Sequence, residues 1–203
     1  VGEDGVTHHG VFDMAAFGAV PGLTIAAPMN EPELRNMMYT ALGSGHPFMI
    51  RYPRGHGEGL PWRGEKFETL PVGRGRRLRE GADAALLTVG TVGNAAARAA
   101  GRAAAEGVSV AHYDLRFVKP LDEALLDEVG RKFRRVVTVE DGSLRGGVGE
   151  AVAAFFNGRG YDVRVQRLGI GDEWVEHGTP GQLYALCGYD EEGILRALLD
   201  TRA

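Results

Sequence analysis

Residues 84–90 read Ala-Ala-Leu-Leu-Thr-Val-Gly, a short apolar run closed by a glycine. A run of this length and composition is typical of a strand buried on both faces. The alanine-rich segment from Thr91 to about Glu106 predicts a helix that stops at Gly107. A second apolar run at residues 108–113 predicts another strand. The order strand, helix, strand is typical of parallel sheets and indicates an α/β fold.

The same alternation continues toward the C-terminal end of the chain. Two more strands are expected at residues 135–140 and 163–168, with helices at 121–129, 147–157, 180–186 and 191–199. Residues 82–203 are therefore expected to form a complete α/β domain with a mostly parallel sheet of at least four strands. Residues 75–79 are expected to add a short edge strand.

A smaller strand–helix–strand unit precedes this domain. Strands are predicted at residues 23–27 and 47–50, and Asn30 is expected to cap the helix between them, with Glu33 at the capping-box position. Five residues at helical spacing predict one apolar helix face: Leu34, Met37, Met38, Ala41 and Leu42. Because this unit is too small to make a complete sheet, its neighbours are expected in an upstream part of a longer polypeptide. Residues 56–81, rich in Gly, Pro, Arg and Glu, predict a linker.

Composition excludes several classes of function. The chain has 203 residues, with 23 basic and 27 acidic side chains, and its net charge of −4 argues against a nucleic-acid partner. No apolar run approaches the roughly 18 residues that cross a membrane. The single cysteine, Cys187, excludes a disulfide framework, and we expect a cytoplasmic protein. Because the chain begins with Val1, we interpret it as a fragment or a processed chain whose partner is the upstream piece.

Two polar clusters stand out. Residues 3–13 read Glu-Asp-Gly-Val-Thr-His-His-Gly-Val-Phe-Asp, and residues 51–55 read Arg-Tyr-Pro-Arg-Gly directly after a predicted strand. Ligands of parallel sheets bind beyond the carboxyl ends of strands. We hypothesise that both clusters face one ligand, with the histidines at hydroxyl or carbonyl oxygens and an arginine on an anion. The alternative is a glycine-rich surface loop beside a solvated arginine pair.

Two further stretches have competing interpretations. Residues 140–149 read Glu-Asp-Gly-Ser-Leu-Arg-Gly-Gly-Val-Gly, where a strand ends and a helix begins. Helix amides can hold a phosphate there, but the spacing of a dinucleotide fingerprint is absent, which favours a tight turn with close helix packing. His177 lies beside acidic residues, which allows a metal or proton site, although a histidine that only satisfies a loop is the commoner case.

The motifs resemble those of the 1-deoxy-D-xylulose-5-phosphate synthase family. They are Asp-Gly-Val-Thr-His at residues 4–8, Ala-Pro at 27–28, Glu-Leu at 33–34, Ile-Arg-Tyr-Pro-Arg-Gly at 50–55, Glu-Asp-Gly at 140–142 and Glu-His-Gly at 176–178. The first motif is shared with the wider transketolase superfamily. The motif at residues 50–55 is the one that points to the synthases.

The resemblance implies a domain organisation. Residues 1–55 would end a transketolase-like pyrimidine-binding domain, residues 56–81 would be the linker, and residues 82–203 would be the complete transketolase C-terminal domain, used mainly in packing and in the homodimer. Thiamine diphosphate and Mg²⁺ would be bound mainly by parts that are missing from this chain, because the Gly-Asp-Gly…Asn signature and the activating glutamate are not here. No residue is therefore assigned to cofactor or metal, and the chain alone is expected to be inactive.

The reaction that the resemblance implies is a transferase reaction. Pyruvate and D-glyceraldehyde 3-phosphate would condense to 1-deoxy-D-xylulose 5-phosphate and CO₂, the first step of non-mevalonate isoprenoid biosynthesis and a supply for thiamine biosynthesis. By the family pattern, Asp4 and His8 would be catalytic and contact substrate oxygens, and Arg54 would bind the phosphate. The roles of four other polar residues stay open: His9, Arg51, Tyr52 and His177.

Three alternatives remain open from the residues alone. Two are thiamine enzymes with other acceptors, namely the β subunit of a 2-oxo acid dehydrogenase and a transketolase proper. The third is a non-catalytic dimerisation or regulatory module, because residues 84–203 show no clear site.

Overall fold

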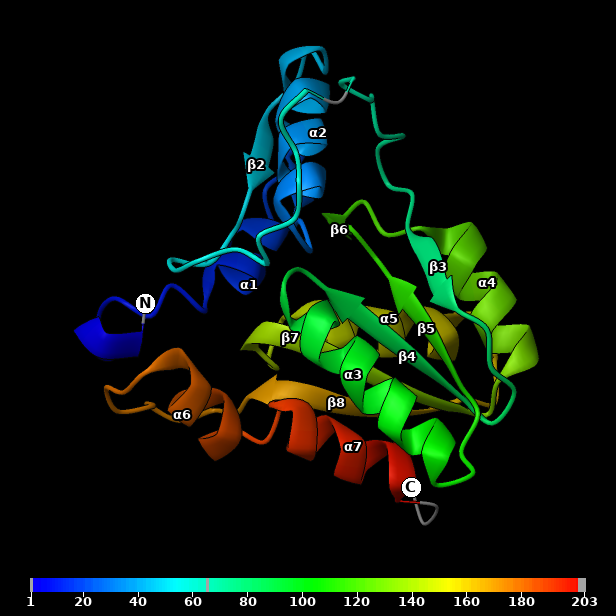
Figure 1. Cartoon of the computed structure of the whole chain (residues 1–203). Helices are drawn as coiled ribbons and strands as arrows, with labels where there is room; N and C mark the ends of the chain where they lie inside the picture. The colour runs from blue at the N-terminus through cyan, green and yellow to red at the C-terminus, as the bar shows by residue number, and fades with distance from the viewer. Residues whose placement is uncertain (1, 65, 201–203) are drawn as a thin grey trace.

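The computed structural model describes residues 2–64 and 66–200, which form two sheets (Figure 1). The larger sheet has five strands in the order β3-β5-β4-β7-β8. Their bounds are β3 (Arg76–Arg79), β4 (Ala84–Val89), β5 (Val110–Asp114), β7 (Arg135–Ser143) and β8 (Arg164–Ile170). β4 pairs in parallel with β5 and β7, and β7 with β8, whereas β3 pairs antiparallel with β5. The predicted mostly parallel α/β sheet and its edge strand are confirmed.

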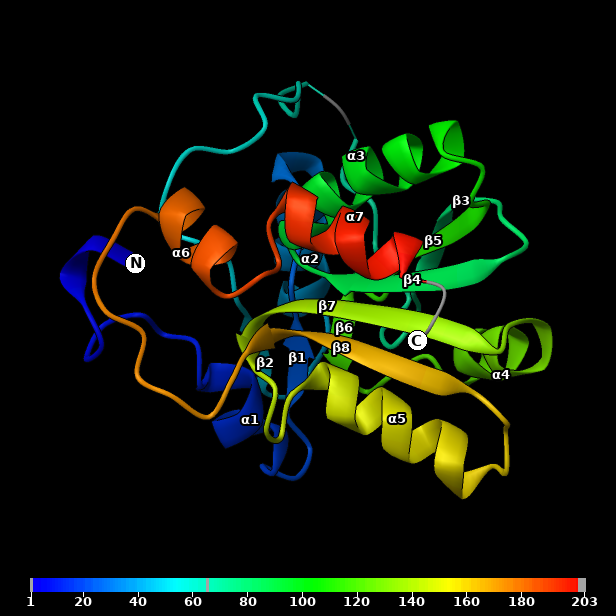
Figure 2. The same cartoon turned by 90° about the horizontal axis from the view of Figure 1, so that it is seen from below.

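Helices cover both faces of the larger sheet (Figure 2). Leu86 of β4 points toward α3 (Val92–Ala105) and α7 (Glu191–Leu199), in one apolar cluster. The alternate residues Ala85, Leu87 and Val89 point toward α4 (Glu123–Lys132) and α5 (Val148–Gly158), in a second cluster. Because successive strand side chains face opposite ways, a fully apolar strand needs helices on both sides. Within the described residues no helix is long and apolar enough to cross a bilayer.

The smaller sheet has the strand order β2-β1-β6. β1 (Thr24–Ala26) and β2 (Phe48–Ile50) are parallel, as expected for a strand–helix–strand unit. β6 (Phe117–Lys119) pairs antiparallel with β1 and comes from the second half of the chain. The expectation that the neighbours of this unit lie upstream was therefore wrong for one edge of β1. β6, a strand that the sequence pattern did not predict, fills that edge.

α2 (Glu31–Leu42) differs from the predicted amphipathic helix. Asn30 caps it as expected, since its Oδ1 accepts a hydrogen bond from the backbone N–H of Glu33. The predicted single apolar face is wrong: Met37 is fully buried, but Met38 is 56% exposed and Leu42 is 87% exposed. The buried stripe is largely polar instead, because its side chains bond to other segments. Thr40 Oγ1, for example, accepts a hydrogen bond from the N–H of Leu70 at 2.8 Å.

Two carboxylates and two guanidinium groups join the two sheets, and we call them the interdomain clamp: Glu33, Arg76, Asp114 and Arg116. Glu33 Oε2 accepts from Arg116 Nε at 2.9 Å, and Glu33 Oε1 accepts from Arg116 Nη2 at 2.8 Å. Arg76 Nη1 lies 3.0 Å from the same Oε1, and Arg76 Nε donates to Asp114 Oδ2 at 3.1 Å. Glu33 therefore does not complete a capping box, because its carboxylate is committed to the clamp.

His112 lies in β5 beside the clamp and is 1% exposed. Its Nε2 lies 2.9 Å from Thr88 Oγ1. Burial, and then the positive charges of Arg76 and Arg79, lower the pKa of His112 to about 4. The folded protein therefore holds this imidazole neutral at a pH where the unfolded chain would protonate it.

Acid should destabilise the protein through His112. Because the pKa of His112 is lower in the folded protein than in the unfolded chain, the neutral imidazole contributes fully to the free energy of unfolding above pH 6.5. This contribution is lost as the pH falls from 6.5 toward 4. Between pH 7 and pH 5 this loss should be about 2 kcal/mol in the free energy of unfolding. Urea unfolding at the two pH values measures this loss. It should be absent in the His112→Gln variant and should persist in the control variant His177→Gln, which changes an exposed histidine. An undiminished loss in His112→Gln would contradict the assignment.

Candidate functional site

The two polar clusters meet in the structure. Asp4 ends the short 3₁₀ helix η1 (Gly2–Asp4), and Arg54 follows the end of β2. Arg54 Nη1 donates to Asp4 Oδ2 at 2.5 Å, across 50 positions of sequence. The side chains are 68% and 40% exposed, so this pair is open to solvent and to ligands. The structure thus brings the glycine-rich loop and Arg54 into contact, and Arg54 is solvated as the alternative interpretation expects.

His8 lies in the turn that follows η1. Its backbone N–H donates to Gly5 O at 3.0 Å, and Gly5 adopts a φ of 80°, a conformation that glycine permits. The hydrogen bond of its ring is with Thr7 Oγ1, 2.9 Å from Nδ1. The structure thus places exposed His8 on the same segment as Asp4, with its ring bonded to Thr7.

Arg51 has a different environment from Arg54. Its Nε donates to Asp13 Oδ2 at 2.7 Å, and its Nη2 donates to the carbonyl oxygen of Asp141 at 2.9 Å. The side chains of Arg51 and Asp13 are only 15% and 19% exposed. Asp13 begins α1 (Asp13–Gly18), and Asp141 belongs to β7. Arg51 therefore joins β2 to two other elements, and the alternative interpretation of a solvated arginine pair is wrong for it.

The side chain of Asp141 extends this arrangement. Tyr189 donates its hydroxyl to Asp141 Oδ1 at 2.9 Å, and Tyr184 donates to Oδ2 at 3.3 Å. Burial, and then the charge of Asp141, raise the pKa of both tyrosines, so that both hydroxyls keep their protons and act as donors. We call this group the Arg51 hub: Arg51, Asp13, Asp141, Tyr184 and Tyr189. Sequence reasoning missed the two tyrosines, because they lie more than forty residues from Asp141, one in α6 (Pro180–Leu186) and the other in the connection to α7 (Glu191–Leu199), with no motif around them.

Glu140 settles the interpretation of residues 140–149. Its carboxylate accepts from the N–H groups of Val148 at 2.7 Å and Gly149 at 2.8 Å, at the start of α5. Burial raises the pKa of this carboxyl, and the two backbone hydrogen bonds oppose that shift. A Cβ at Gly147 would lie 2.4 Å from Glu140 Oε2, so the close packing requires glycine. The amides that a phosphate would need are occupied by the protein's own carboxylate, and the predicted tight turn is confirmed.

Of the other two histidines in the motifs, His9 makes a structural contact and His177 is exposed. His9 Nε2 lies 2.8 Å from the carbonyl oxygen of Val175, so His9 ties the first segment to the stretch before α6 (Pro180–Leu186). His177 is exposed, and no group of three metal-ligating side chains exists among the residues that the structure describes. A metal site at His177 finds no support.

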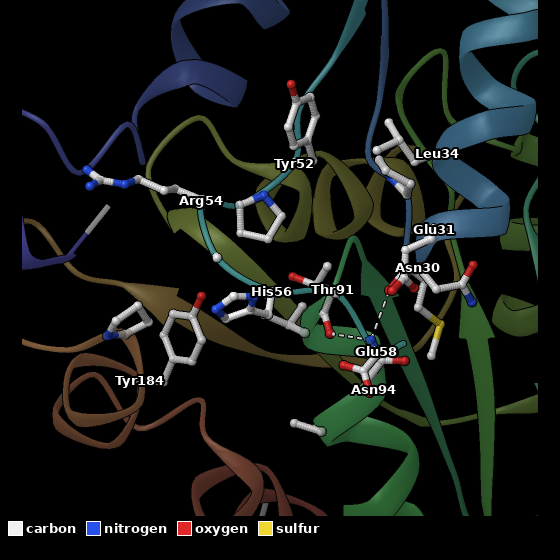
Figure 3. Close-up of a pocket in the computed structure, with 18 of the residues that line it drawn as sticks. Asn30, Glu31, Leu34, Tyr52, Arg54, His56, Glu58, Thr91, Asn94 and Tyr184 are labelled. Atoms are coloured by element: carbon white, nitrogen blue, oxygen red, sulfur yellow. Dashed lines mark hydrogen bonds between the residues drawn. The ribbon is translucent and has the colours of Figure 1, made fainter. Parts of the chain in front are cut away.

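A cavity of about 600 Å³ lies behind Arg54 (Figure 3). Residues 52–58 form one wall, and the starts of α2 and α3 form others, with Tyr184 closing a further side. Its volume is within the range of small-molecule sites, and a mostly apolar lining with a few polar groups is typical of them. Figure 3 shows the guanidinium of Arg54 directed away from Glu58 and Asn94.

Two family models match the chain. The transketolase pyrimidine-binding domain matches residues 1–58, and the transketolase C-terminal domain matches residues 73–194. The chain belongs to the transketolase family. A solved relative of this family, described as a split-gene transketolase in an inactive beta4 tetramer, aligns with a TM-score of 0.84 and 28% identity over 96% of this chain and 62% of that chain. A transketolase mutant from Pichia stipitis, 20% identical, aligns with a TM-score of 0.73 over 96% of this chain and 27% of that chain, and shows the fold alone.

Curated relatives of this transketolase-family chain match it along its length. The 1-deoxy-D-xylulose-5-phosphate synthase of Bacteroides fragilis is 56% identical over 204 residues, which cover 100% of this chain and 31% of that protein. The synthase of Bacteroides thetaiotaomicron is 54% identical over 98% of this chain and 31% of that protein. The chain thus spans about a third of the length of these relatives.

Proposed function

We propose that the chain is the C-terminal part of a 1-deoxy-D-xylulose-5-phosphate synthase. This transferase condenses pyruvate with D-glyceraldehyde 3-phosphate, releases CO₂, and serves isoprenoid and thiamine biosynthesis. The observation that carries the proposal is the contact between Asp4 and Arg54, which joins the two motifs of the resemblance at one exposed place. Relatives named as synthases, 56% and 54% identical, favour it over a 2-oxo acid dehydrogenase subunit, a transketolase or a non-catalytic module.

The domain boundaries and partners belong to the same proposal. Residues 1–55 end the pyrimidine-binding domain, residues 56–81 are the linker, and residues 82–203 are the C-terminal domain. The upstream part of the same enzyme completes the site, and the whole acts as a cytoplasmic homodimer. The 31% share of the relatives' length that the chain spans supports the upstream part, and the family models over residues 1–58 and 73–194 support the two domains.

Thiamine diphosphate and Mg²⁺ are proposed to be held mainly by the upstream part. The described residues offer no cluster of three metal-ligating side chains, so none of them is assigned to Mg²⁺. Bound thiamine diphosphate supplies the carbanion chemistry of carbon–carbon bond formation. The residues of this chain bind and orient the substrates beside it.

Arg54 is proposed to bind the phosphate of the aldehyde. A guanidinium has five N–H donors in a planar fork, and the hydrogen bond to Asp4 uses one of them. The remaining donors suit the oxygens of a phosphate, which accept charge-assisted hydrogen bonds. Asp4 in turn balances the guanidinium charge when no phosphate is present.

Asp4 and His8 are proposed to act at substrate oxygens. Thr7 engages Nδ1 of His8, which leaves Nε2 as the ring nitrogen for a substrate hydroxyl or carbonyl oxygen. An imidazole is suited to moving a proton at such an oxygen near neutral pH. The carboxylate of Asp4 accepts a hydrogen bond from a substrate hydroxyl and fixes its orientation.

Arg54→Ala in the complete enzyme should weaken the use of D-glyceraldehyde 3-phosphate and leave unphosphorylated glyceraldehyde nearly unaffected. Loss of a charge-assisted contact costs roughly 1.5–3 kcal/mol, or about one to two decades in kcat/KM. Steady-state kinetics with both aldehydes measures this, with Arg63→Ala, at an exposed arginine of the linker, as the matched control. Equal losses with both aldehydes would remove Arg54 from the phosphate site.

His8→Ala should lower turnover by about 10²-fold, because a group that handles a developing charge matters most in the transition state. The affinity for thiamine diphosphate should stay near that of the unmodified enzyme, since His8 is not assigned to the cofactor. Turnover number and cofactor titration on the same preparation check both parts. An unchanged turnover number would leave His8 as a loop residue only.

A further inference from the structure

The segment that carries Arg54 has little structure of its own. Residues 52–58 are all exposed. No backbone–backbone hydrogen bond joins them to the rest of the described chain: the last one before them is from Arg51 N–H to Ala26 O. A segment of this kind opens locally at low cost in free energy. Besides its own hydrogen bond to Asp4, the position of Arg54 therefore depends on contacts at the ends of the segment.

The Arg51 hub holds the first end. One guanidinium is bonded by two different nitrogens to α1 and to β7, through Asp13 Oδ2 and Asp141 O. Only a planar fork reaches both acceptors at once, which a lysine ammonium on the same stem does not reproduce. The end of β2 is thereby fixed to the C-terminal half of the chain, three residues before Arg54.

Glu31 holds the second end. Its Oε1 accepts a hydrogen bond from the backbone N–H of Gly59 at 2.7 Å. A Cβ at Gly57 would lie 2.2 Å from that oxygen, so glycine lets the backbone run against the carboxylate. Glu31 is the first residue of α2, and the same first turn carries Glu33 of the interdomain clamp. Both ends of the segment are thus tied to buried or helical parts of the structure.

We propose that Arg51 and Glu31 are positioning residues that hold residues 52–58 as a strap along the cavity, with Arg54 held at Asp4. Releasing either end lengthens the free loop. A longer free loop loses more conformational entropy when Arg54 is held at Asp4. The consequence for substrate use rests on the proposed function of Arg54. The holding of the strap does not, because it follows from the hydrogen bonds at its ends.

Limited trypsin digestion of the chain tests the strap directly. Trypsin cleaves after Arg54, inside the strap, and after Arg63, outside it, so Arg63 is an internal reference. Arg51→Gln and Glu31→Ala should each raise the rate of cleavage at Arg54 relative to Arg63 by about tenfold, since each removes end contacts. Glu31→Gln keeps the acceptor for Gly59 and should cleave as the unmodified chain does.

An unchanged ratio in Glu31→Ala would overturn the proposal, and so would an equal rise in Glu31→Gln. Circular dichroism and the urea midpoint identify a variant that fails to fold, and the Glu31 pair keeps the test decisive if Arg51→Gln does so.

Kinetics of the complete enzyme separate this inference from the proposed function. Glu31→Ala should raise the KM for D-glyceraldehyde 3-phosphate by about tenfold, with the KM for pyruvate unchanged and with recovery in Glu31→Gln. Faster cleavage at Arg54 without any change in that KM would support the strap and overturn the phosphate role of Arg54. Unchanged cleavage would overturn the strap whatever the kinetics show.

Discussion

The ion pair between Glu33 and Arg116 is the interaction on which the arrangement of the two sheets depends. Glu33 is 5% exposed, and its carboxylate accepts hydrogen bonds from both Nε and Nη2 of Arg116. Removing one partner of such a pair leaves a buried charge without compensation, which costs roughly 3–5 kcal/mol. Arg116 also precedes β6, and its carbonyl oxygen accepts from the N–H of Ala27, so the pair and the strand pairing reinforce each other at one place.

The exposed site follows from this buried constraint. The clamp fixes the first turn of α2, and that turn carries Glu31, which holds one end of the strap. The pairing of β1 with β2 and with β6 fixes the point where β2 ends, and Arg51 anchors that point to α1 and β7. Arg54 is itself exposed and bonds to Asp4, and the inferred strap adds contacts at Arg51 and Glu31 to that hydrogen bond.

The sequence predicted the larger sheet well, because local periodicity carries that information. The strand at residues 84–89 and the helices around it were recognisable, since a strand buried on both faces is apolar throughout. β6 and the buried stripe of α2 were not recognisable from the sequence. A polar side chain such as Thr40 is buried only because a backbone group distant in sequence forms a hydrogen bond with it. The Arg51 hub was missed for the same reason. That the segments of Asp4 and Arg54 lie near each other agrees with the hypothesis that both clusters face one ligand, but the hydrogen bond between the two side chains was not predicted.

A double-mutant cycle on the clamp tests its central role most directly. The free energy of urea unfolding is measured for the unmodified chain, Glu33→Gln, Arg116→Gln and the double variant. Coupling of about 2 kcal/mol or more is expected, within the range for residues in one buried network. The exposed pair of Arg134 and Asp162, whose side chains are 77% and 93% exposed, serves as the control, with coupling below about 1 kcal/mol. Additive effects of Glu33→Gln and Arg116→Gln would contradict the account.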